Sequence, residues 1–350
     1  MSGLLVLVTG TGRSGTSTIT GTLHHLGLSV PGPLLGANES NPRGFFESRW
    51  ATKFHKGLAE SAKINPFDSR PWAFDRAQAA VTPRMRSRLV QFLAEHAGQP
   101  QVVIKDPRSV WTQALWKEAA AEVGLDIRYI SMLRHPAEVV GSRTTYYARG
   151  DEDKLREYAT FNVARWMNSS LISERETRGD RRSFVQYTEL LKDWRPVLAQ
   201  VRSELGLTFN DDLQPGHEHP VDLFIDPELR RHRVAWTDLG VPTALQRMAQ
   251  EVWEQLVDLS RSSMDPRPSS RLDDLAEAYA DLVGDASAIS HDVVAEARMS
   301  AREEGAREAL EQAALRAAQA PVGQRLVDEV GGRELLRVLG RRAVRRLGRR

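Results

Sequence analysis

The stretch Leu4-Leu5-Val6-Leu7-Val8-Thr9-Gly10-Thr11-Gly12-Arg13-Ser14-Gly15-Thr16-Ser17 decides the fold. Its first half is a short apolar run, typical of a strand buried on both faces of a parallel sheet. Its second half is a glycine-rich turn, and a helical pattern with Ile19, Leu23 and Leu26 on one face follows it as far as Gly27. A turn between a strand and a helix gathers backbone N–H groups at the positive end of the helix dipole. We therefore expect this loop to bind a phosphate or a related anion.

Three more segments are predicted to be buried strands, at 101–105, 127–133 and 183–187. Helical patterns alternate with them at 84–96, 112–123 and 155–175. This alternation implies a central parallel sheet flanked by helices on both faces, which is a three-layer, P-loop-like α/β fold. Such a sheet binds its ligands at the carboxyl ends of the strands.

The composition changes near residue 260. Residues 260–271, SRSSMDPRPSSR, are rich in Ser, Pro and Arg, which is typical of a linker. Beyond them, Leu272, Leu275 and Tyr279 follow the spacing of an amphipathic helix, and residues 293–318 favour helix. We expect a main domain at 1–265 and a helical appendage at 266–350. The helices of the appendage could pair two copies of the chain.

The end of the chain is basic. Arg333, Arg337, Arg341 and Arg345 recur every four residues beside an apolar stripe. A basic amphipathic helix of this kind can lie on an anionic membrane surface, although a solvated helix end is the simpler interpretation. Nucleic-acid binding is not expected, because aromatic residues are not interleaved with the basic ones.

The overall composition is that of an ordinary globular enzyme, with 350 residues, 41% hydrophobic, 27% charged and a net charge of +2. The absence of cysteine excludes disulfides, thiol nucleophiles and cysteine metal sites. No apolar stretch is long enough to span a bilayer, and the first residues lack the basic flank of a secretory signal. We expect a cytoplasmic location. No metal is expected either, because no His and Asp residues are clustered at the spacing of metal ligands.

The glycine-rich loop has three possible interpretations. A dinucleotide fold requires an acidic residue about twenty positions later to hold the ribose, and residues 28–37 contain none. An ATPase or kinase loop requires a Lys where this sequence has Thr16. The third is a phosphate loop with a cation in its middle, at Arg13. A P-loop kinase or nucleotide-binding regulator remains the alternative, as does a scaffold at 272–350 with a vestigial nucleotide site.

A second phosphate site is predicted where the strand at 127–133 ends. Arg134 follows the strand directly, and Pro136 suits the first turn of a helix. Ser142 then lies about two turns into that helix. An arginine fork and a hydroxyl placed in this way can hold one phosphate from two sides.

Together these motifs resemble the nucleotide site of PAPS-dependent sulfotransferases, in particular those of the bacterial branch. In that family a Lys or Arg precedes x-Gly-[ST]-[ST] in the 5'-phosphosulfate loop, and an Arg and a Ser at this separation bind the 3'-phosphate. The resemblance implies 3'-phosphoadenosine-5'-phosphosulfate (PAPS) as donor and adenosine 3',5'-bisphosphate (PAP) as product. It assigns nucleotide binding to these residues: Gly12, Arg13, Ser14, Gly15, Thr16, Ser17, Arg134 and Ser142.

Other segments fit the same family, so that the resemblance covers residues 4–231. Lys105 ends a predicted strand, as a family lysine does, and this would aim it at the transferring sulfonate. Residues 185–191 resemble the Tyr-x-[DE]-Leu segment of the family, and residues 224–231 resemble a further landmark. The implied activity is sulfuryl transfer to the hydroxyl of a carbohydrate, a glycolipid or a small-molecule natural product.

Sulfuryl transfer parallels phosphoryl transfer, in which the protein positions groups and stabilises charge on the leaving oxygen. Arg13 and Lys105 are the candidates for that stabilisation, together with N–H groups of the loop. The acceptor hydroxyl needs a general base. The Lys-x-His pattern of the cytosolic branch would put histidine at Pro107, so another residue must act.

We choose Glu47 as the base, because several relatives place a catalytic Glu in this region. An ion pair of this carboxylate with Arg43 or Arg49 is the structural alternative. Other candidate bases are Glu39, Asp106 and His135, whereas His24, His25 and His55 are expected to be packing or surface residues.

Overall fold

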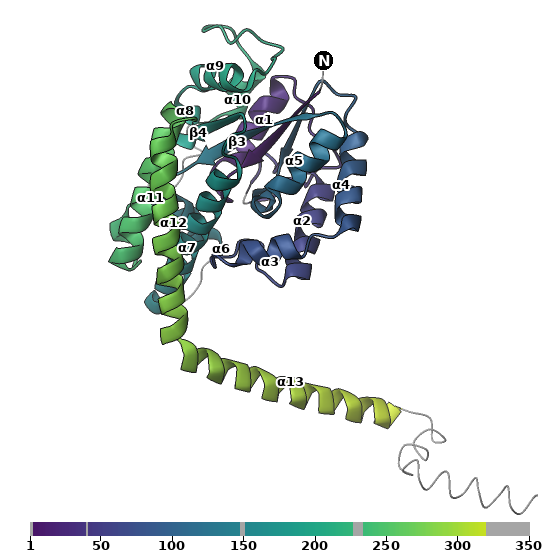
Figure 1. Cartoon of the computed structure of the whole chain (residues 1–350), viewed down its shortest axis with the longest axis vertical. Helices are drawn as coiled ribbons and strands as arrows, with labels where there is room; N and C mark the ends of the chain where they lie inside the picture. The colour runs from purple at the N-terminus through teal and green to yellow at the C-terminus, as the bar shows by residue number, and fades with distance from the viewer. Residues whose placement is uncertain (1–2, 40, 148–150, 227–233, 320–350) are drawn as a thin grey trace, which may run out of the picture. The chain divides into compact units, whose positions relative to one another are not determined.

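The computed structural model describes residues 3–39, 41–147, 151–226 and 234–319, and its contacts divide the chain into units at 1–283 and 284–350. Within the described part of the first unit, four parallel strands form one sheet (Figure 1). In spatial order they are β2 (Gln101–Lys105), β1 (Leu4–Thr9), β3 (Asp126–Leu133) and β4 (Arg182–Gln186). The strands that the sequence predicted are confirmed within one residue at their ends.

All carboxyl ends of the strands meet at one edge of the sheet. Val8 of β1 pairs with Lys105 of β2, and Thr9 pairs with Ser131 of β3. The order β2-β1-β3-β4 has a switch point between β1 and β3, where the chain connections diverge to opposite sides. Doubly wound sheets bind their ligands in the crevice at such a point. The fold therefore directs the search for a site to the residues that follow β1 and β3.

Helices cover both faces of the sheet, because successive side chains of a strand point to opposite faces. Val6 and Val8 point to the face that is covered by α1 (Thr16–His25), α8 (Tyr187–Lys192) and α9 (Trp194–Leu205). Leu5 and Leu7 point to the face that is covered by α2 (Arg49–Ala62), α4 (Pro83–Ala94) and α5 (Gln113–Glu122). The predicted three-layer α/β fold is confirmed.

The remaining helical segments lie outside these two groups of covering helices. They are α3 (Ala73–Ala79), a 3-10 helix (Pro107–Trp111), α6 (Pro136–Tyr147), α7 (Glu152–Glu176), α10 (Pro220–Phe224), a 3-10 helix (Trp236–Asp238), α11 (Thr243–Arg261), α12 (Pro266–Ile289) and α13 (His291–Gln319).

Residues 260–271 do not form the linker that their composition predicted. Helix α11 ends at Arg261 and α12 begins at Pro266. Beyond that start, Leu272, Leu275 and Tyr279 are buried in one apolar cluster with side chains of α7 and α11. The first compact unit therefore ends at residue 283, rather than at the expected residue 265, because the first half of α12 carries core side chains.

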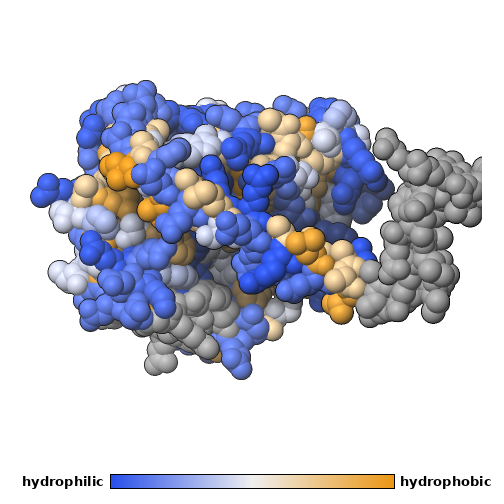
Figure 2. Space-filling model, turned by 90° about the horizontal axis from the view of Figure 1, so that it is seen from below, coloured by the Kyte–Doolittle hydropathy of each residue, from blue (hydrophilic) through white to orange (hydrophobic). Residues whose placement is uncertain are grey.

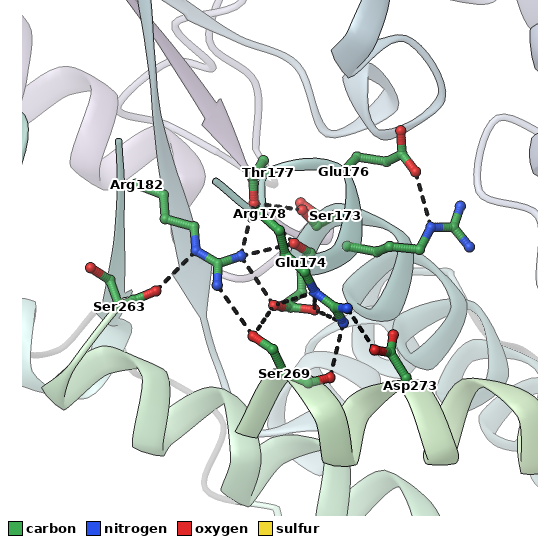
Figure 3. A network of polar contacts seen from close by, with 10 residues as sticks. Ser173, Glu174, Glu176, Thr177, Arg178, Arg182, Ser263, Ser269 and Asp273 are labelled. Carbon is green, nitrogen blue, oxygen red and sulfur yellow. Dashed lines mark hydrogen bonds and ion pairs between the residues drawn. The ribbon is translucent and has the colours of Figure 1, made fainter. Parts of the chain in front are cut away.

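A buried charge network connects α12 with α7 and β4 (Figure 3). The fully buried Glu174 carboxylate of α7 accepts hydrogen bonds from Arg178 at 2.6 Å, from Arg182 at 3.0 Å and from the Ser269 hydroxyl at 2.7 Å. Arg182 of β4 also donates to the Ser263 carbonyl, which lies between α11 and α12. Two guanidinium groups thus share one carboxylate, and the position of α12 depends on that charge balance.

In the second unit, the described residues form the end of α12 and the whole of α13, which confirms the helix expected at 293–318. Val293, Met299, Leu310 and Leu315 of α13 are exposed. The basic stretch from Arg333 to Arg345 lies outside the described residues. None of the helices described is long and apolar enough to cross a membrane. The face drawn in Figure 2 is mostly hydrophilic, with hydrophobic residues in small separate groups.

We expect Glu174→Gln to lower the free energy of unfolding by about 3–5 kcal/mol, because it leaves the buried guanidinium of Arg182 without a counter-charge. Glu176→Gln is the matched control on the same helix. Its partner Arg175 is half exposed, so that change should cost less than about 1 kcal/mol. Urea unfolding followed by circular dichroism measures both. Equal effects of the two substitutions would contradict the proposed role of the network.

Candidate nucleotide site

A cavity of about 450 Å³ lies at the carboxyl edge of the sheet. Its walls come from the loop after β1, residues 41–47, the ends of β2 and β3, and α6, α7 and α8. Among the described residues that line it, only Glu47 is acidic, whereas seven are cationic: Arg13, Arg43, Lys105, Arg108, Arg134, Arg143 and Arg165. Clustered charge of one sign attracts a ligand of the opposite sign. The cavity is therefore suited to a strongly anionic ligand.

The loop after β1 needs glycine at its end. Gly15 has a φ of 91°, and a Cβ atom there would lie 2.2 Å from the ring of Tyr187. The N–H of Ser14 closes a turn by donating to the Thr11 carbonyl at 3.1 Å. Helix α1 begins directly afterwards, and the first N–H groups of a helix have no partner within it. Gly15, Thr16 and Ser17 all line the cavity, so this helix end offers an anion site.

One predicted loop residue is turned away from the cavity. Ser14 is fully buried, and its hydroxyl bonds to that of Thr11 at 2.5 Å. Only its backbone is left for a ligand. Gly12, Arg13 and Ser17 line the cavity, and the Ser17 hydroxyl also accepts a hydrogen bond from Asn41 at 3.2 Å.

Arg134 and Ser142, the pair predicted to hold a phosphate, both line the cavity. The Arg13 Nε donates to the Ser142 hydroxyl at 3.1 Å, and the Arg134 Nη1 donates to the Arg13 carbonyl at 3.1 Å. Arg134 also pairs with Glu138 at 3.1 Å, and its guanidinium lies 4.9 Å from the centroid of the Tyr187 ring. Its Nη2 is buried and has no acceptor in the described part of the chain. Arg134 thus keeps a buried donor that none of the described residues satisfies.

Glu47 lies between two cations at the end of β2. Its Oε1 is 2.6 Å from the Lys105 Nζ, and its Oε2 is 2.8 Å from the Arg108 Nη2. Burial lowers the pKa of Lys105, and the charges of Glu47 and Asp106 oppose that effect. Glu47 is thus ion-paired, but with Lys105 and Arg108 and not with the expected Arg43 or Arg49. Arg43 instead bonds to Asp226 at 3.3 Å, and Arg49 bonds to the Leu34 carbonyl at 3.1 Å.

A buried chain of hydrogen bonds holds Arg108 from behind. Asp106 Oδ1 lies 2.7 Å from the Arg108 Nε, and Oδ2 lies 2.9 Å from the His55 Nδ1. The Trp116 indole donates to the His55 Nε2 at 3.0 Å, so Nδ1 carries the proton of a neutral ring. Burial alone would raise the pKa of Asp106, but its interaction with His55, followed by that with Arg108, holds that pKa below its ordinary value. His55 is a packing residue, as expected.

The other candidate bases do not line the cavity. Glu39 is exposed, and Asp106 is fully buried behind Arg108. His135 packs between two tryptophans and bonds to Gln250 at 3.0 Å, and burial lowers the pKa of its ring. Of the carboxylates proposed as base, Glu47 alone reaches the cavity lining that the structure describes.

Sequence reasoning missed part of the site. Arg143 donates to the Asn162 Oδ1 at 2.9 Å and to the Gly12 carbonyl at 3.3 Å, and Phe67 lies beneath its guanidinium. Arg143 follows Ser142 directly, so the strand-end motif offered a signal for it. Phe67, Asn162 and Arg165 come from a loop and a helix without any motif. Among the described residues, no cluster of three or more His, Asp or Glu could hold a metal ion.

The model of a family described as "Sulfotransferase family" matches residues 6–211. A search of curated proteins found no match. Among solved structures, the sulfotransferase domain of the Synechococcus PCC 7002 olefin synthase is 20% identical, with 73% of this chain and 96% of that chain covered and a TM-score of 0.41. Sulfotransferase STF9 from Mycobacterium avium is 13% identical, with 73% and 77% covered and a TM-score of 0.42.

Proposed function

The chain belongs to the sulfotransferase family, and we propose that it transfers the sulfuryl group of PAPS to a hydroxyl of an acceptor and releases PAP. The observation that supports this donor most is the contact between two anion sites, the loop after β1 and the pair Arg134 and Ser142. Arg13 of the loop bonds through its side chain to Ser142 and through its carbonyl to Arg134. PAPS carries anionic groups at its 5' and 3' positions and could engage both sites.

The buried Nη2 of Arg134 favours a nucleotide with a 3'-phosphate. ADP has a single phosphate chain, which would leave that donor without an acceptor. An unsatisfied buried donor costs about 1–3 kcal/mol. The lining also suits the charge of PAPS, because its seven cations face a single carboxylate among the described residues.

The chain would promote transfer by fixed positive charge. Charge grows on the bridging oxygen as PAP departs, and Arg13, Lys105 and the N–H groups of the loop are our candidates for stabilising it. Lys105 is 2% exposed, and buried charges act more strongly than solvated ones. Glu47 keeps the ammonium group of Lys105 in place, and Asp106 does the same for the guanidinium of Arg108.

Glu47 would also accept the proton of the acceptor hydroxyl. An ionised carboxylate has about four acceptor sites, so it can receive a hydroxyl while Lys105 and Arg108 hold it. Glu47 lines the cavity, as a base must in order to reach the acceptor. A carbohydrate, a glycolipid or a small-molecule natural product remains our expected acceptor. A cytoplasmic location and membrane contact through the basic tail remain predictions as well.

We expect PAP to bind about tenfold more tightly than ADP, or better. Satisfying one buried donor is worth about 1–3 kcal/mol, and about 1.4 kcal/mol changes the affinity tenfold. Calorimetric titration of both nucleotides measures it. Arg134→Lys should remove most of the preference, because lysine cannot replace the guanidinium fork. Arg49→Lys is the control outside the cavity and should keep the preference. A wild-type chain that prefers ADP with magnesium would reject PAPS in favour of a P-loop kinase or regulator.

We expect Glu47→Gln to lower kcat by roughly 10²–10⁴-fold, the usual contribution of a general base. The rate of PAP formation is measured with the best acceptor from a screen with labelled PAPS. Glu60→Gln, an exposed change on α2, should leave kcat unaltered. PAP affinity should stay within about threefold in both variants. If Glu47→Gln keeps kcat and raises only the KM for PAPS, Glu47 positions Lys105 and is not the base.

A further inference from the structure

Arg165 differs from the other cations of the cavity. Each of the other six donates to a described side-chain acceptor, for example Arg13 to Ser142 and Arg143 to Asn162. Arg165 lines the same cavity from α7, but it has no hydrogen bond or ion pair to any residue that the structure describes. Its guanidinium lies 4.5 Å from the centroid of the Phe161 ring.

The surroundings of Arg165 compensate its charge only in part. The side chain is half-buried, and this burial lowers its pKa. The acid that acts on it is Asp68, whose carboxylate already pairs with Arg70 at 2.6 Å. A ring face offsets only part of a buried charge, on the order of 0.5–2 kcal/mol. A ligand anion would supply the missing partner.

The contacts proposed for the donor do not include Arg165. The two anion sites proposed for PAPS belong to the loop after β1 and to α6, where Arg13, Arg134 and Ser142 already contact one another. Arg165 instead lies on α7, on the same face as Tyr158 and Asn162, because residues seven and three positions apart align on a helix.

One wall of the cavity is formed by Phe67, Tyr158 and Arg165, and it combines two aromatic rings with a cation that has no hydrogen-bonded counter-ion among the described residues. Phe67 lies 5.4 Å beneath the guanidinium of Arg143 and 6.0 Å from that of Arg108, which holds Glu47. Arg108 thus connects this wall with the proposed base, and both line the same cavity. A molecule held here would present a ring or chain to the aromatic residues and an acid group to Arg165.

We propose that Arg165 selects the acceptor, and that the acceptor carries a carboxylate or another oxyanion in addition to its reacting hydroxyl. The inference rests on the proposed sulfotransferase function. A guanidinium fork binds a carboxylate through two parallel hydrogen bonds, which a neutral ester or amide cannot accept with equal strength. The excess of cations in the cavity would offset the repulsion between an acidic acceptor and the donor.

The test compares hydroxy acids with their methyl esters as acceptors of the whole chain. The panel contains pairs with aromatic, aliphatic and sugar hydroxyls, such as 4-hydroxybenzoate and glucuronate with their esters, and PAP formation is followed. We expect the better acids to exceed their esters at least about tenfold in kcat/KM. Arg165→Gln should abolish this preference by raising the KM for the acids. Arg175→Gln should retain it, since Arg175 lies on the same helix against Phe74, away from the cavity lining.

The affinity for PAP separates the possible failures. A wild-type chain that does not bind PAP overturns the proposed function and this inference with it. If PAP binds as expected, three results would overturn the inference alone. They are esters that react as well as the acids, a panel in which no acid reacts, and an Arg165→Gln variant that keeps the preference for acids. A loss of PAP affinity in Arg165→Gln would assign this cation to the donor and also overturn the inference.

Discussion

The backbone of Arg13 is the constraint on which the site depends. Its φ of 76° lies in the left-handed region, which a residue with a side chain rarely adopts. In this conformation the Arg13 carbonyl accepts a hydrogen bond from Arg134, and the Arg13 side chain donates one to Ser142. Strain of this kind persists only where neighbouring groups fix it, and it concentrates at functional sites. Gly15, packed against Tyr187, fixes the same loop from its other end.

Charge balance explains how so many cations share one cavity. Lys105 and Arg108 share Glu47, Arg108 is also held by Asp106, and Arg134 is held by Glu138. These pairs fix the cations before a ligand arrives, so that little reorganisation remains for the reaction. Arg165 has no such pair among the described residues. In our account the cavity is preorganised for the donor and still lacks one anion, which the acceptor supplies.

The sequence predicted what local patterns encode. Residues at or after the ends of buried strands could be found from the pattern of the strands. They are Arg13, Lys105, Arg134 and Ser142. The partners of Glu47 could not be found in this way, since Lys105 at the end of β2 and Arg108 in the 3-10 helix after it are far along the chain from Glu47. The linker predicted at residues 260–271 was wrong for a physical reason. Ser, Asp and Pro occur in linkers and also at helix starts, and here α12 begins at Pro266. Phe67 and Arg165 meet the site only through tertiary packing.

A crystal structure of the chain with bound PAP tests the central claim most directly. The account predicts a 3'-phosphate oxygen within hydrogen-bonding distance of the Arg134 Nη2 and the Ser142 hydroxyl, with the 5'-phosphate against the N–H groups of Gly15, Thr16 and Ser17. A 3'-phosphate that points to solvent, while Arg134 keeps its present contacts, would contradict it.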